Sequence, residues 1–407
     1  MSDVTEVKAE TLNEKKVMFG KGERDYSVDV VRSISCLMVV TGHVCSFMME
    51  RCPYDPAVGI TETWNALATL RCMSVSATNM FLMISGIFFL SPERNVTISK
   101  IWSKNILKMA VAYVLWCMIY SAFRICYTNH GGAFDWSLLG QDIFWQETLN
   151  REYHLWYIPM MLGIYVIVPI MRVFTEHAQR KHYLYIIGLM IGAISLNTLK
   201  IFSTYYSYPG SENVITIIDD TPTLLICQYP FYCILGYYLY TYRPKLKTRI
   251  LLYLLGIAGV CLMIYLTAFF YQETGATNLA EIQSRFTIGV LAKNTALFVF
   301  LLTVFSKVKW RKAARVVISK VSAATLFIYL SHILFVRVLI QERWLMDGEM
   351  DLFQVGCIDI AVVYVFGFLI SLLFLQLIPW TQMRNVVLDA VWPGRRIWNG
   401  GKHRSKK

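Results

Sequence analysis

The sequence predicts an all-α, polytopic integral membrane protein with about ten transmembrane helices and both termini in the cytoplasm. Of the 407 residues, 56% are hydrophobic and only 16% are charged, whereas soluble domains carry about 25% charged residues. The apolar residues form blocks of about twenty, a length that crosses the hydrocarbon core of a bilayer. A single block could be a buried core helix, but so many leave too little polar chain to cover such cores. The blocks are 28–49, 73–90, 106–127, 155–173, 183–202, 222–242, 250–271, 286–306, 321–340 and 355–379.

Basic residues concentrate on alternate loops. The N-terminal tail, the even-numbered loops and the C-terminal tail hold most of the 39 Lys and Arg residues, and the positive-inside rule places such segments in the cytoplasm. We therefore expect a polar cytoplasmic tail over 1–26, a transmembrane domain over 27–383 and a basic cytoplasmic tail over 384–407. The net charge of +12 then reflects contact with anionic lipid headgroups rather than binding of nucleic acid.

The first block holds Arg32 and His43. They lie on one helix face, about 16 Å apart along the axis, and ionisable groups at membrane depth are functional candidates. Arg32 could act on a substrate, or merely extend to the inner headgroups. His43, beyond the midplane, could be a general base or form a helix–helix hydrogen bond. Asp29, three residues before Arg32, could pair with it.

Two features follow the second block. Ser85 and Gly86 form a small-residue notch that suits helix packing or the approach of a ligand. Lys100, Lys104 and Lys108 follow at spacings of four, so they stack on one helix face near the cytoplasmic surface. This lysine stripe could bind the phosphates of an anionic ligand or contact lipid headgroups.

The remaining candidates fall toward the outer half of the membrane. His154, Trp156 and Tyr157 gather at the mouth of the fourth block, near Glu152, although interfacial aromatic residues alone say little. Lys293 should face the bundle interior and have either a partner or a deprotonated amine, because an unpaired charged lysine at that depth is costly; Asp359 is one possible partner. His332 lies in the ninth block, also in the middle or outer half. These ionisable candidates are His43, His154, Lys293, His332 and Asp359.

The ten cysteines show no metal-ligand spacing, so no metal site is expected. Most lie in helices as small buried side chains. Cys52 and Cys72 flank the first external loop and could form a disulfide in an oxidising compartment.

Four motifs resemble the acyltransferase-3 family of membrane O-acyltransferases. Residues 29–43 read DVVRSISCLMVVTGH, with the family's Arg-x10-His pattern at Arg32 and His43. Residues 81–91 read FLMISGIFFLS and precede a basic stretch. Later come HLWYIPMMLGIYVIVP at 154–169 and YLSHILF around His332. The lysines at 100–108 depart from the arginines that relatives often carry, and Lys binds phosphate only as a point charge.

The resemblance implies a ten-helix acyltransferase domain that stands alone, without an extracytoplasmic hydrolase domain. It implies transfer of an acyl group, usually acetyl, from cytoplasmic acyl-CoA to a hydroxyl of an extracytoplasmic or lipid-linked carbohydrate at the cell membrane. His43 would be catalytic with Arg32 beside it. The lysine stripe would bind the donor phosphates, and His154, Trp156, Tyr157, His332 and Lys293 would shape the acceptor site. Acyl-CoA would be a co-substrate, and no bound cofactor is expected.

Two other classes fit the same composition. Intramembrane His, Lys and Asp also suit a proton-coupled transporter of a small polar solute, which discontinuous helices and inverted repeats would favour. A receptor-like module that only binds acylated lipid or sugar is the third possibility.

Overall fold

The computed structural model describes residues 24–52, 59–127, 142–205, 208–220, 229–274, 283–341 and 351–377. Within these ranges the chain is helical and has no strand. The predicted C-terminal tail and all but the last three residues of the predicted N-terminal tail lie outside the described residues.

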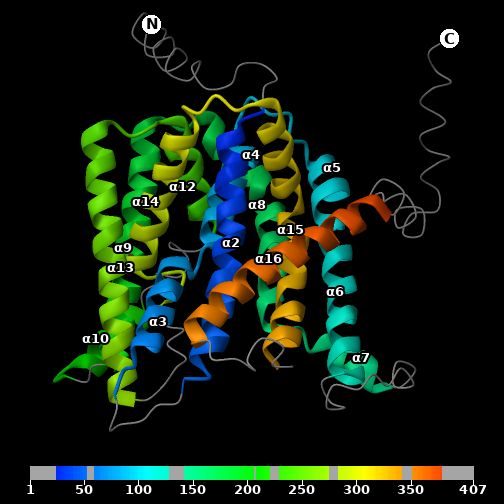
Figure 1. Ribbon diagram of the computed structural model, residues 1–407. Coiled ribbons are helices and arrows are strands. Elements are labelled where there is room, and N and C mark those ends of the chain that lie inside the picture. Colours follow the sequence, from blue (N-terminus) through cyan, green and yellow to red (C-terminus); the bar gives the residue numbers. More distant parts are fainter. Residues whose placement is uncertain are drawn as a thin grey trace, which may run out of the picture. The chain divides into compact units, whose positions relative to one another are not determined.

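Figure 1 shows the helices in chain order. They are α2 (Tyr26–Met49), α3 (Glu62–Ser74), α4 (Thr78–Phe89), α5 (Ile98–Lys100), the π-helix η1 (Ile101–Ile106), α6 (Leu107–Cys126), α7 (Asp142–Leu149), the 3-10 helix η4 (Tyr153–Trp156), α8 (Tyr157–His177), α9 (Arg180–Tyr205), α10 (Ser211–Asp220), α12 (Tyr229–Thr241), α13 (Leu246–Thr274), α14 (Ile288–Phe305), α15 (Lys312–Gln341) and α16 (Leu352–Leu377).

Among the described residues, 9 helical segments are long and apolar enough to cross a membrane. They overlap nine of the predicted blocks, so the predicted all-α polytopic fold is confirmed. The remaining block, 222–242, contains α12. Its 13 described residues span only about 20 Å, and residues 221–228 lie outside the described ranges.

The chain divides into two compact units, each described here by itself. The first comprises Met1–Asn95, Ile170–Thr325 and Arg343–Ala361. The second comprises Val96–Pro169, Leu326–Glu342 and Val362–Lys407. Three helices, α8, α15 and α16, contribute residues to both units.

In the first unit, α2 packs against α3, α4 and α14 (Figure 1). A second close contact joins α4 to α12. A Cβ added at Gly86 would overlap the backbone of Cys233, and one added at Gly236 would overlap the backbone of Met83. Only glycine allows two backbones this close, so this pair of glycines sets the separation of the two helices.

The predicted block 73–90 is in fact a broken helix that begins earlier. α3 ends at Ser74, α4 starts at Thr78, and Ser76 between them has a φ of 59°. The break frees backbone carbonyls that would cost several kcal/mol each in hydrocarbon without a donor. Polar side chains from the segment 283–294 supply those donors, as described below.

The second unit contains α6, α7, the first part of α8 and the second part of α15. Tyr120 of α6 links two of them. Its hydroxyl donates to the carbonyl of Leu330 (2.9 Å) and accepts from the amide of Leu334 (3.2 Å). An α-helix normally joins these two backbone groups to each other, so Tyr120 bonds to both members of one backbone pair of α15, beside His332.

Candidate active-site residues

Arg32 lies half-buried on α2 in the first unit. Its Nη1 donates to Ser322 Oγ at 3.5 Å, and its guanidinium stands 5.1 Å from the ring centre of Phe88. Ser322 in turn donates to Asp29 Oδ1 at 2.6 Å. Arg32 is therefore held at the end of a short polar chain rather than extended freely toward headgroups.

The expected pair of Asp29 with Arg32 is not what forms. Asp29 makes its ion pair with Arg24, whose Nε lies 2.6 Å from Oδ2. That hydrogen bond raises the pKa of Arg24. Three residues of spacing bring Asp29 and Arg32 onto neighbouring positions, but Arg24 reaches the same carboxylate from before the helix.

His43 is half-buried on the same helix, while Val44 and Cys45 beside it are fully buried. The residue before it lies against the helix break, since a Cβ at Gly42 would stand 3.7 Å from the Cα of Val75. The imidazole is thus carried by a segment packed on the break, and part of its surface is open.

Lys293 of α14 supplies donors to the break. Its Nζ donates to the carbonyl oxygens of Val75 (2.5 Å) and Cys72 (3.3 Å). Its neighbour Asn294 donates to the carbonyl of Ser76 at 2.9 Å. The expected pairing of Lys293 with Asp359 is therefore wrong, because freed carbonyls satisfy the ammonium. Lys293 is buried and has a partner, and it is not open to an acceptor.

In the second unit the structure brings together five side chains that we call the imidazole cluster. The rings of His154 and His332 meet edge-on with centroids 5.1 Å apart, and both residues are 0% exposed. Tyr329 donates through its hydroxyl to the carbonyl of His154, and its own carbonyl lies 2.6 Å from His332 Nδ1. The cluster comprises Tyr120, His154, Tyr157, Tyr329 and His332.

Glu152 adjoins this cluster as a buried carboxylate held by two arginines. Its oxygens lie 3.2 Å from Arg124 Nη1 and 2.5 Å from Arg337 Nη2. Arg124 also donates to the carbonyl of Glu147 at 2.8 Å. The three charges fix α6, the start of α8 and α15 to one another within the second unit.

The lysine stripe runs through a π-helix. Lys100 ends α5, Lys104 lies in η1, and Lys108 is in the first turn of α6. Four residues overrun an α-helical turn by about 40°, but they fall short of a turn closed by i→i+5 bonds. The two offsets oppose each other, so the three lysine positions remain near one face of the helix. Lys100 and Lys104 are exposed, and Lys108 is half-buried.

The family model described as "Acyltransferase domain", that of the acyltransferase-3 family, matches residues 25–380. The chain belongs to this family. No curated protein and no solved structure matches it. The protein is accordingly a membrane acyltransferase, an enzyme that transfers groups other than aminoacyl groups.

The predicted candidates of this acyltransferase divide between its two units. Arg32, His43 and Lys293 belong to the first unit, together with Ser85 and Gly86. Ser85 donates to the carbonyl of Phe81 in its own helix at 2.8 Å, and Gly86 forms the contact with α12. The second unit holds the lysine stripe, His154, Trp156, Tyr157 and His332.

Sequence reasoning missed several residues of the acyltransferase. Tyr120 and Arg337 had no local signal, because each acts on a segment far away in the chain. Arg71 of α3 is 8% exposed and has no ion pair among the described residues, so it is a second buried cation of the first unit. Arg94 stacks 4.4 Å from the ring centre of Phe88, and burial lowers the pKa of Arg94.

Cys52 and Cys72 do not pair in the acyltransferase. Both are free and buried. The Sγ of Cys72 lies 3.6 Å from the hydroxyl of Thr267 and accepts a hydrogen bond from the side-chain amide of Gln283 at 3.4 Å. The Sγ of Cys52 lies 3.7 Å from the carbonyl oxygen of Met48, four residues earlier. Burial raises the pKa of the Cys52 thiol.

Proposed function

We propose that the enzyme moves an acetyl group from cytoplasmic acetyl-CoA to a hydroxyl of an extracytoplasmic or lipid-linked carbohydrate, with His43 as the reacting imidazole. One observation carries the choice of His43. Among the described histidines of the membrane interior, His154 and His332 are 0% exposed and enclosed by aromatic rings, whereas His43 is partly open. A general base has to come within hydrogen-bond reach of the proton it removes.

The chemistry is a thioester-to-hydroxyl exchange. His43 takes the proton of the acceptor hydroxyl while that oxygen attacks the thioester carbonyl carbon. The C–S bond then breaks, and the thiolate of CoA leaves and takes up a proton. In the alternative order, the imidazole attacks first and carries the acetyl group as a covalent relay before the acceptor hydroxyl receives it.

The other residues would position substrates. Arg32 is held by Ser322 and directed over Phe88, which leaves it able to orient a donor or to fix the helix of His43. Lys100 and Lys104 are exposed and would bind the phosphates of the donor as point charges. His154, Trp156, Tyr157 and His332 would shape the acceptor site. Lys293 would act indirectly, through the helix break.

The proton-coupled transporter is the rival that a discontinuous helix favours. Among the described residues, α3 and α4 form such a helix, with the break at residues 75–77. However, its freed carbonyls are occupied by Lys293 and Asn294, so the break is filled by the protein itself.

The test uses the full-length protein in lipid nanodiscs with labelled acetyl-CoA and a panel of glycans. We expect His43→Ala to lower transfer by at least 100-fold, the scale of general base catalysis, with an unchanged melting temperature. His177→Ala, at an exposed histidine near the end of α8, is the matched control and should keep full activity. Undiminished transfer by a folded His43→Ala variant would remove His43 from the mechanism.

A further inference from the structure

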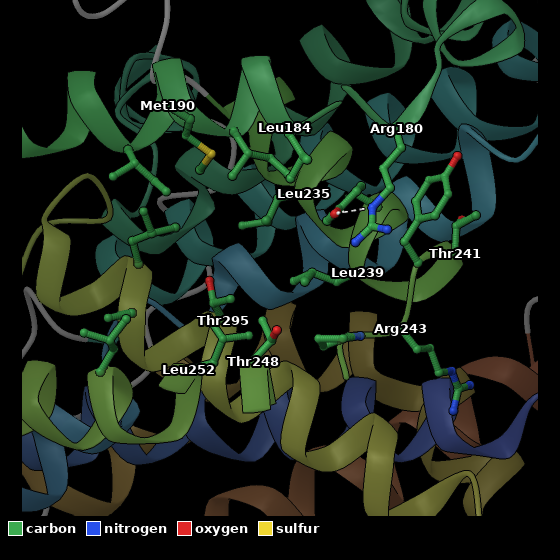
Figure 2. Close-up of a pocket in the computed structure, with 18 of the residues that line it drawn as sticks. Arg180, Leu184, Met190, Leu235, Leu239, Thr241, Arg243, Thr248, Leu252 and Thr295 are labelled. Carbon is green, nitrogen blue, oxygen red and sulfur yellow. Dashed lines mark hydrogen bonds between the residues drawn. The ribbon is translucent and has the colours of Figure 1, made fainter. Parts of the chain in front are cut away.

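The first unit contains a cavity of about 680 Å³ that the proposed reaction does not use. It lies between α9, α12, α13 and α14, and Figure 2 shows the side chains that line it. Its volume falls within the range of about 300–1,000 Å³ that is typical of ligand sites.

Helix packing explains why this space is open. α13 packs tightly on α14, where a Cβ at Gly259 would stand 2.8 Å from the carbonyl oxygen of Gly289. α9 meets α13 late in both helices, where Ile201 packs against Phe270. The cavity lies near the start of both helices, beside Leu184 and Leu252. The two helices thus enclose a slot that is closed at one end.

The walls of the slot are apolar and continue onto a lipid-facing surface. Met190 and Leu235 are buried in it, whereas Leu184 and Leu255 are 50% and 49% exposed. The outer faces of α9 and α13 carry further exposed large apolar residues, including Leu189, Leu251, Leu254 and Ile257. A slot that opens between such faces is accessible from the hydrocarbon of the bilayer.

The open end of the slot is cationic. Arg180, Arg243 and Lys245 line it, and none of the described lining residues is acidic. Figure 2 shows Arg180, Thr241 and Arg243 on the side of the slot away from Met190 and Leu252, with the guanidinium groups of Arg180 and Arg243 pointing in different directions. The Nε of Arg180 donates to the hydroxyl of Tyr238 at 3.5 Å. Arg243 uses one donor on Ser306 at 2.8 Å, which leaves other guanidinium N–H groups for a ligand.

We propose that this slot binds an anionic phospholipid of the bilayer. The phosphate lies at Arg180, Arg243 and Lys245, and one acyl chain lies between Leu184, Leu235 and Leu252. Basic pockets between transmembrane helices at the cytoplasmic side suit anionic headgroups. Arg180 begins α9, and Arg243 and Lys245 lie between α12 and α13; the positive-inside rule places both segments on that side. Entry from the lipid-facing side distinguishes this ligand from a water-soluble donor such as acyl-CoA.

The experiment titrates the purified full-length protein with phosphatidylglycerol and with phosphatidylcholine, followed by native mass spectrometry. We expect phosphatidylglycerol to bind at least tenfold more tightly. The triple variant Arg180→Gln, Arg243→Gln, Lys245→Gln should lose at least tenfold of that affinity and leave phosphatidylcholine binding unchanged. Leu252→Trp fills the slot without changing the charge, so it should weaken binding of both lipids.

The matched control removes three charges from the loop between α14 and α15, by Lys307→Gln, Lys309→Gln and Arg311→Gln. These residues are exposed and do not line the slot, so phosphatidylglycerol affinity should stay within twofold. Equal binding of the two lipids, or an equal loss in the control triple, would overturn the proposal. Displacement of bound phosphatidylglycerol by acetyl-CoA would also overturn it, because the slot would then belong to the donor.

Discussion

At the scale of single residues, Glu152 is a buried carboxylate that forms ion pairs with two arginines of the second unit. Its side chain is 3% exposed, whereas its partners Arg124 and Arg337 are 17% and 21% exposed. Breaking a buried ion pair by removing one partner costs about 3–5 kcal/mol, because a charge is left uncompensated. The partial exposure of both arginines reduces this figure through solvent screening.

We expect Glu152→Gln to destabilise the protein by about 2–3 kcal/mol, at or below the lower limit of that range because solvent screens the two arginines. The readout is the melting temperature of the purified protein in nanodiscs. Asp219→Asn is the control, because it breaks a more exposed ion pair. The side chain of Asp219 is 54% exposed and that of its partner Lys200 is 34% exposed, and exposed pairs contribute under about 1 kcal/mol to stability. A melting temperature equal to that of the control would show that the arginines find other partners.

At the scale of elements, the break between α3 and α4 depends on a cation from another helix. The carbonyls of Cys72 and Val75 accept hydrogen bonds from Lys293, and the carbonyl of Ser76 accepts one from Asn294. The positive φ of Ser76 is an unusual conformation for a residue other than glycine. Side chains from α14 therefore hold a local structure that residues 74–78 would not adopt by themselves.

We predict that Lys293→Met destabilises the fold by about 2–4 kcal/mol, because two buried carbonyls lose their donor at about 1–3 kcal/mol each. Methionine keeps most of the side-chain volume, so the effect reports the lost hydrogen bonds. Lys307→Met, at an exposed position, should leave the melting temperature unchanged. A double variant with Asn294→Ala should cost less than the sum of the two single changes, since both donors serve one break. Full additivity would argue against a shared structural unit.

The close contact between α4 and α12 gives a second prediction at this scale. Gly86→Ala places a methyl group against the backbone of Cys233, which cannot move aside as a flexible side chain can. We expect a loss of about 3 kcal/mol or more, at or above the upper end of overpacking effects. Gly188→Ala in α9 is the control, because nothing lies within 4 Å of its added Cβ, and it should stabilise the helix by about 0.5–1 kcal/mol. Melting temperatures of the two variants should therefore shift in opposite directions.

The elements also show what the sequence can and cannot disclose. Runs of apolar residues identify spans because the bilayer imposes a length on each one independently. The break at Ser76 is not readable in this way, since its donors lie more than two hundred residues away in the chain. The same reason explains the wrong partner chosen for Lys293: charge suggests a carboxylate such as Asp359, and backbone carbonyls carry no sequence signal. The meeting of His154 with His332 likewise depends on which helices pack together.

At the scale of the whole molecule, the predicted orientation depends on whether the segment containing α12 crosses the membrane. The 13 described residues of α12 cover about 20 Å, less than the hydrocarbon thickness of about 30 Å. If the segment crosses, the loop between α14 and α15 is cytoplasmic, as its basic residues predict. If it does not, every later loop changes side, and that loop becomes extracytoplasmic.

Cysteine labelling in intact cells separates the two arrangements. Glu62→Cys at the start of α3 and Lys309→Cys after α14 are both exposed positions. We expect a membrane-impermeant maleimide to label Glu62→Cys directly, and Lys309→Cys only after permeabilisation. The unmodified protein gives the background, which should be low. Seven of the nine described cysteines are buried, and the two exposed ones, Cys261 and Cys357, lie in membrane spans, which a membrane-impermeant reagent does not enter. Labelling of Lys309→Cys in intact cells would contradict the cytoplasmic placement of this loop and, because Arg243 bonds to Ser306 beside it, of the cationic end of the slot.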